Sequence, residues 1–85
     1  MRTTITVCGV GQRKTGVSPK NNQPYDFQQV SFTYPDKWTT GEAAATSLVN
    51  GSDIDAVGGQ IMVGMQYDAV YHTYGGKVII DALLA

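Results

Sequence analysis

Apolar and polar side chains alternate along several short segments of the chain. The clearest are Thr3–Val10, Tyr25–Tyr34 and a pair at Ile61–Tyr71 and Val78–Leu84. Alternation with a period of two is typical of strands that bury one face. Ten glycines and three prolines separate these segments and mark turns. About five strands with short turns predict an all-β fold, a small barrel that forms a single domain over residues 1–85.

The segment Glu42–Val49 fits two structures. Its three alanines, with Thr40 as an N-cap and Asn50-Gly51 as a stop, favour a short helix. Its second half, Thr46–Val49, fits a strand better. Propensity alone does not decide between them. The residues Ser52–Asp55 fit one helical turn before the next glycines.

Length and composition limit what the chain can do. A chain of 85 residues buries a limited core, and association into oligomers commonly stabilises such small domains. Cys8 is the only cysteine, so no disulfide forms within the chain, and a reducing compartment is favoured. No apolar run resembles a signal peptide or the ~20 residues of a membrane span. We expect a cytoplasmic protein without membrane contact.

Charge is distributed unevenly along an acidic chain. The net charge is −1 and the pI is near 5.5. Residues 1–20 contain no acid and four cations, which are Arg2, Arg13, Lys14 and Lys20. The remaining residues contain only Lys37 and Lys77 against seven acids. Such asymmetry fits a basic surface on an acidic fold, although a mixture of charges that only keeps the protein soluble fits equally well.

No combination of residues matches a catalytic or metal-binding motif. His72 is the only histidine, and we expect it to be a solvated residue near a hairpin tip. We expect Cys8 to be a small core residue. Asp53 and Asp55 lack the further ligands of a calcium loop and are expected in a turn or cap. The glycine-rich pieces lack the residues of phosphate loops. The sequence therefore predicts no enzyme, no catalytic residue, no metal and no cofactor.

The segment Arg13–Phe27 combines cations, small polar residues and two aromatics. On a strand, Tyr25 and Phe27 share a face. Binders of single-stranded nucleic acid need this combination, because cations follow the backbone while rings stack on bases. A solvated hairpin with both rings in the core is the structural alternative. The alternation divides the strand into one face with Tyr25, Phe27, Gln29, Ser31 and Thr33, and another with Val30, Phe32 and Tyr34.

Two parts of the chain also resemble a known family. Thr15-Gly16-Val17-Ser18, followed by Gln23-Pro24-Tyr25, resembles the DNA-binding wing of the filamentous-phage single-stranded-DNA-binding proteins, the helix-destabilising, gene-five-type family. Near the C-terminus, Tyr74-Gly75-Gly76 and the strand Val78–Leu84 are similar to the closing strands of that family. Order, spacing and total length agree at both ends, over about half of the chain.

The resemblance implies a small five-stranded barrel of the oligonucleotide/oligosaccharide-binding (OB) type with a protruding β-hairpin wing. It also implies a homodimer that coats single-stranded phage DNA cooperatively during replication, in the cytoplasm of a bacterial host. Lys14 matches a wing cation that contacts phosphate, and Lys20 lies near a second. Tyr25 matches the wing tyrosine, and Phe27 the apolar residue beside it. Tyr74 matches a loop aromatic that reaches DNA bound by the partner subunit.

The chain also departs from the family pattern. The arginines of the last strand are absent at Asp81–Leu84, and the lysine of the third strand is absent at Glu42–Val49. We therefore expect Arg13, Lys14 and Lys20 to neutralise the phosphates, with the aromatic residues stacking on bases. The resemblance also favours a strand at Glu42–Val49.

Further candidate DNA contacts are Tyr34, Trp38 and Lys77. An exposed Trp38 would provide a ring on which bases stack, although a tryptophan beside the Pro35 turn more often covers the end of a barrel. The alternative function is a small β-barrel module that binds a protein partner and no nucleic acid. The residues do not distinguish DNA from RNA.

Overall fold

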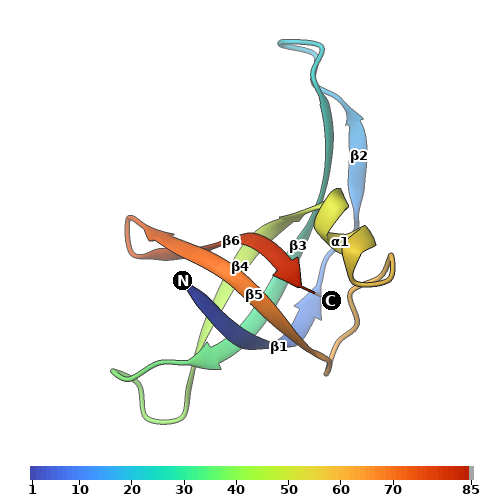
Figure 1. Ribbon diagram of the computed structural model, residues 1–85. Helices are drawn as coiled ribbons and strands as arrows, with labels where there is room; N and C mark the ends of the chain where they lie inside the picture. Colours follow the sequence, from blue (N-terminus) through green and yellow to red (C-terminus); the bar gives the residue numbers. More distant parts are fainter. Residues whose placement is uncertain (85) are drawn as a thin grey trace.

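The computed structural model describes residues 1–84 and contains six strands and one short helix (Figure 1). In chain order these are β1 (Arg2–Val10), β2 (Lys14–Val17), β3 (Pro24–Pro35), β4 (Glu42–Asn50), α1 (Gly51–Ala56), β5 (Gln66–Tyr74) and β6 (Lys77–Leu84). The predicted all-β fold is confirmed. Within the described residues, no helix is long and apolar enough to span a membrane.

All six strands belong to one antiparallel sheet. β1 lies between β3 and β5, and β6 pairs with β5. β1 and β2 pair with successive parts of one edge of β3, while β4 pairs with the other edge. Over residues 1–84, no ladder joins β4 to β6. A hydrogen bond from the Ile80 amide to the Ser47 hydroxyl (3.1 Å) connects them instead. The sheet is not closed, and the expected OB-type barrel is not confirmed.

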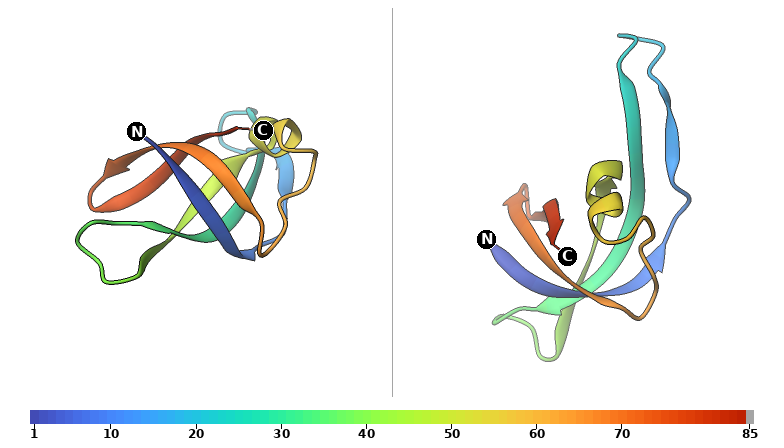
Figure 2. Two further views of the ribbon diagram at one scale, coloured as in Figure 1. Left: turned by 60° about the horizontal axis from the view of Figure 1, so that its bottom comes forward. Right: turned by 45° about the vertical axis from the view of Figure 1, so that its right-hand side comes forward.

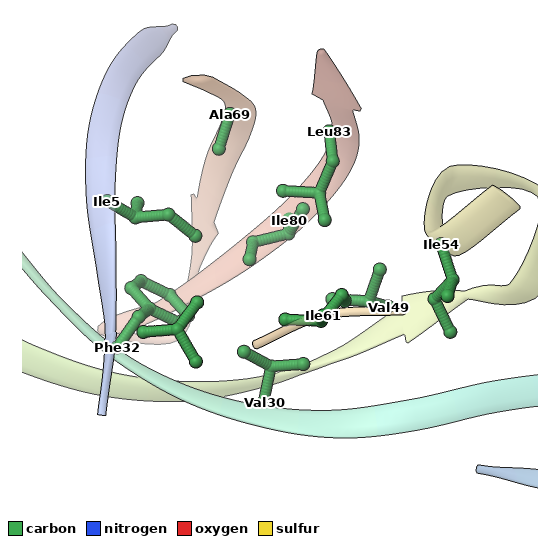
Figure 3. Packing of buried hydrophobic residues seen from close by; sticks show 10 residues of the cluster. Ile5, Val30, Phe32, Val49, Ile54, Ile61, Ala69, Ile80 and Leu83 are labelled. Carbon is green, nitrogen blue, oxygen red and sulfur yellow. The ribbon is translucent and has the colours of Figure 1, made fainter. Parts of the chain in front are cut away.

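The core lies on the inner face of the curved sheet. Its buried apolar side chains point toward one another from five strands, α1 and the loop before β5 (Figure 3). They are Ile5, Val7, Val30, Phe32, Val49, Ile54, Ile61, Ala69, Ile80 and Leu83. Fully burying a Val, Leu, Ile or Phe side chain stabilises a fold by about 1.5–3 kcal/mol. The predicted alternation of β3 is confirmed, because Val30 and Phe32 have no exposed surface.

The segment Glu42–Val49 is a strand. β4 pairs with β3 in continuous register, from Glu42 opposite Pro35 to Asn50 opposite Phe27. This ladder satisfies the backbone groups of the segment and buries Val49, whereas a short isolated helix is marginal in water. The predicted strand is confirmed. The predicted helical turn is confirmed as well, as α1.

The strand expected from Ile61 begins later, at Gln66. Gly64 adopts a φ of 87°, a conformation that favours glycine and interrupts an extended chain. Its amide donates to the Val7 carbonyl (2.8 Å), and the Val7 amide donates to the Met65 carbonyl (3.0 Å). The loop therefore follows the edge of β1. The expectation of a strand over Ile61–Met65 is wrong.

Cys8 and His72, for which the sequence predicted no catalytic or metal-binding role, have surroundings that differ from those we expected. Cys8 is exposed, so its expected place in the core is wrong. The β1–β3 pairing shifts register between Val7 and Gly9, and this bulge leaves Cys8 unpaired. His72 is exposed as expected, but it lies within β5. Its Nδ1 atom is 2.7 Å from Oδ1 of Asp81.

Candidate nucleic-acid interface

A hairpin formed by β2 and the first part of β3 projects from the sheet (Figure 1), and we call Lys14–Phe27 the wing. The view at the right of Figure 2 shows it standing clear of the other strands. Its tip is closed by hydrogen bonds from the Ser18 amide to the Gln23 carbonyl and from the Asn22 amide to the Ser18 carbonyl, both 2.9 Å. The hairpin that the resemblance implies is present, and its first strand, Lys14–Val17, is not among the segments that the alternation predicted.

The register of the wing places four residues on one face. Lys14 is opposite Phe27, and Gly16 is opposite Tyr25. The two aromatic rings lie 5.6 Å apart between centroids, with a tilt of 37°. Tyr25 is exposed and Phe27 is half-buried, and neither belongs to the buried core. The expectation that both rings share one face of the strand is confirmed.

Gly16 leaves space for the Tyr25 ring. A Cβ atom added at Gly16 would lie 2.7 Å from the Tyr25 hydroxyl oxygen and 2.9 Å from the adjacent ring carbon. Any other residue at this position would therefore displace the ring. The pairing of Gly16 with Tyr25 determines how the ring lies on the wing face.

Arg13 lies at the base of the wing and is held by two carboxylates. Its Nε and Nη2 atoms donate to Oδ1 and Oδ2 of Asp26 at 2.8 and 2.7 Å. Its Nη1 atom donates to Oδ1 of Asp55, on α1, at 3.3 Å. The bond to Asp26 raises the pKa of the guanidinium, and the same bond lowers the pKa of Asp26. We call these three residues the Arg13 cluster; it connects the wing to α1.

Gly51, the first residue of α1, makes room for this cluster. It is buried, and an added Cβ atom would clash with the Asp26 carboxylate and lie 2.7 Å from Nη2 of Arg13. Asp55 therefore forms a salt bridge with Arg13, from a distant part of the chain. This differs from the turn or cap role that the sequence suggested. Arg13, expected to neutralise phosphate, already has its charge satisfied within the fold.

Arginines and lysines have different surroundings in this protein. Both arginines form salt bridges, Arg13 in its cluster and Arg2 with Asp68 (3.1 Å). Within residues 1–84, none of the four lysines has a carboxylate oxygen within 4.0 Å. Three of them lie beside an aromatic ring: Lys14 opposite Phe27, Lys77 opposite Tyr74, and Lys37 with Nζ 5.1 Å from the Trp38 ring centroid.

Apart from Lys20, the remaining predicted residues do not lie at the wing. Tyr74 is 76% exposed at the turn between β5 and β6, with Lys77 beside it, and this turn lies apart from the wing (Figures 1 and 2). Tyr34 is half-buried, packs against the core and lies 6.0 Å from the Phe32 ring. Trp38 is 85% exposed, so the expectation that it covers one end of the fold is wrong. Lys20 lies at the wing tip.

Sequence reasoning missed two features beside the wing. Leu48 is 54% exposed on β4 opposite Gln29, and the exposed Asn50 is opposite Phe27, so both extend the wing face across the sheet. Apolar alternation does not indicate Leu48, because in β4 the polar Ser47 is buried and the apolar Leu48 is exposed. The role of Asp55 left no sequence signal, because its partner Arg13 is 42 residues away.

Comparison with known proteins adds no family to these observations. Neither the family models, nor the curated proteins, nor the solved structures give a match to this chain. Within residues 1–84, no group of three or more His, Cys, Asp or Glu side chains is placed to hold a metal ion.

Proposed function

We propose that this protein binds single-stranded DNA without sequence preference, through the wing. The observation that supports this most is the wing face, where Lys14 lies beside the neighbouring rings of Tyr25 and Phe27 on a hairpin open to solvent. Aromatic rings stack on any base, and nearby cations attract the phosphates, so this combination suits sequence-independent binding.

The charge on the wing supports the same function. Residues 14–25 contain Lys14 and Lys20 and no acid. Asp26, the single acid of the wing, is paired with Arg13 and adds no unpaired negative charge. A hairpin that projects from an acidic protein with a positive end attracts a polyanion to that end. Lys14 and Lys20 contact phosphates in this proposal, while Tyr25 and Phe27 stack on bases.

The proposal extends to a homodimer that coats DNA cooperatively during phage replication in a bacterial host, as the family resemblance implies. Tyr74 and Lys77 support a dimer, because they form an exposed aromatic–lysine pair remote from the wing of their own chain. In a two-fold dimer, this pair would reach the strand that the other subunit's wing holds. The same base-stacking chemistry would then be used twice along one strand.

A protein-interaction module is the second candidate function. It is favoured by the loop before β5, where Met62, Val63 and Met65 are 50%, 60% and 47% exposed. Three exposed apolar side chains within four residues fit contact with another protein surface. Such contact would depend little on salt, and nucleic acid would not compete with it.

The experiment is a titration of a fluorescent oligo(dT) at low salt, followed by anisotropy. We expect binding, and we expect Tyr25→Ala to weaken it by about 1–3 kcal/mol. Val17→Ala is the matched control: Val17 is exposed on the opposite face of the same hairpin and should bind as the parent does. Absence of binding to oligo(dT) would overturn the proposal. Thermal unfolding of both variants would show whether either change destabilises the fold.

A further inference from the structure

The loop between β3 and β4 projects at the end of the molecule away from the wing (Figure 1). Trp38 lies in this loop and is 85% exposed, more than any other large apolar side chain in residues 1–84. Tryptophan has the largest aromatic surface of any residue, and it usually gains stability by covering a core. Here the fold leaves that surface uncovered.

The exposure of Trp38 is imposed by an ordered turn. The Thr39 amide donates to the Asp36 carbonyl (3.1 Å), and the Thr39 hydroxyl donates to Oδ2 of Asp36 (2.8 Å). The Trp38 amide donates to Oδ1 of the same carboxylate at 3.4 Å. Asp36 therefore folds the loop back on itself with the tryptophan directed outward. A backbone turn held in this way loses little freedom when a flat group stacks on the ring.

Trp38 has a lysine beside its ring and two carboxylates, Asp36 and Glu42, near its loop. Nζ of Lys37 is 5.1 Å from the ring centroid and has no carboxylate within 4.0 Å among the described residues. The two carboxylates near the loop accept hydrogen bonds, Asp36 within the turn and Glu42 from the Thr33 hydroxyl (3.1 Å). Lys37 thus offers a cation next to a stacking surface, as Lys14 does beside Phe27.

The outer face of β3 connects the two ends. Between Phe27 and the loop it presents Gln29, Ser31 and Thr33, and none of these side chains is charged. On the neighbouring strands the same face presents Gly9 and Thr46 on either side of Ser31, and the exposed Leu48 opposite Gln29. A single strand that leaves the wing along β3 would meet uncharged side chains on β3, pass the Glu42 carboxylate beside Thr33 and then meet Trp38.

We propose that Lys37 and Trp38 form a second base-stacking site, which holds the same single strand as the wing at the other end of β3. This inference rests on the proposed function. A strand bound at both sites must be long enough to follow β3. Short oligonucleotides therefore use the wing alone, and only longer ones gain affinity from Trp38.

The experiment uses two independent signals. Trp38 is the only tryptophan beside five tyrosines, so fluorescence excited at the long-wavelength edge of tryptophan absorption, where tyrosine absorbs little, reports on this site alone. The anisotropy of a labelled oligo(dT) reports on binding anywhere. The lengths compared are about 4 and about 16 nucleotides, the range of single OB-fold sites. The oligonucleotide is kept in excess, so that neighbouring protein molecules rarely share one strand.

We expect the longer oligonucleotide to quench Trp38 fluorescence and the shorter one to leave it unchanged. Trp38→Ala should weaken binding of the longer strand by about 5- to 150-fold, the equivalent of one stacked base. The same variant should not alter binding of the shorter strand, and Trp38→Phe should retain most of the affinity. Met62→Ala, at another exposed apolar position, is the control and should change neither length.

Three outcomes would overturn the inference. Binding by anisotropy without quenching, and with unchanged affinity of Trp38→Ala, would leave the proposed function intact and remove the second site. Fluorescence that changes with protein concentration in the absence of DNA, together with unchanged DNA affinity of Trp38→Ala, would assign the ring to a contact between copies. Absence of any anisotropy change would refute the proposed function itself.

Discussion

The different surroundings of the arginines and lysines lead to a prediction about how DNA affinity depends on salt concentration. Lys14→Gln removes a cation without a carboxylate partner, whereas Arg13→Gln removes one that two carboxylates already neutralise. Each phosphate neutralised on a single strand contributes about −0.7 to the slope of log K against log salt. With the four lysines as an upper limit, the expected slope is about −2.8 per subunit. Lys14→Gln should reduce its magnitude to about 2.1, and Arg13→Gln should leave it unchanged.

The assay is oligo(dT) binding at several salt concentrations. Between about 50 and 200 mM salt, a slope difference of about 0.7 changes the ratio of the parent and variant Kd values by about 2.6-fold. Arg13→Gln is expected to weaken binding by the same factor at every salt concentration, because the wing is no longer held against α1. If Arg13→Gln lowered the slope as much as Lys14→Gln does, Arg13 would leave its carboxylates to bind phosphate, and our interpretation of the cluster would be wrong.

Removal of an acid from the cluster distinguishes positioning from simple charge. Asp55→Asn makes the protein less negative, which by itself favours DNA, but it also removes one of the two partners of Arg13. We expect weaker binding. Asp53→Asn is the matched control, because it removes the same charge from α1. Asp53 itself forms no salt bridge among residues 1–84. Tighter binding by both variants would mean that charge alone decides the affinity.

Two further predictions concern the wing. Because Arg13 lowers the pKa of Asp26 below its ordinary value, their bond stabilises the fold above about pH 3.8 and is lost as the pH falls through the lowered pKa. Asp26→Asn should therefore melt below the parent at about pH 7, and this difference should shrink as the pH falls below about 3.8; a difference independent of pH would contradict this. Gly16→Ala should displace the Tyr25 ring and weaken oligo(dT) binding while the protein stays folded; unchanged affinity in the anisotropy titration would contradict this.

Much of the fold follows from local pattern. The alternation of β3 places Val30 and Phe32 in the core and Tyr25 and Phe27 on the wing face, because successive side chains of a strand point to opposite sides. The closing pair of strands and the turn of α1 follow from the same kind of local signal. The sequence by itself therefore determined the strand faces and the two rings of the candidate site.

Only the tertiary structure decided which long-range contacts form. Glu42–Val49 is a strand because an edge of β3 is free to pair with it, and no local propensity contains that information. Arg13 is neutralised because folding brings Asp55 to the base of the wing from 42 residues away. Trp38 is exposed because the Asp36 turn directs it outward while the core fills from other elements. The alternation of apolar and polar residues indicates on which face of a strand a side chain lies. Charge partners and exposure depend instead on segments that meet only after the chain has folded.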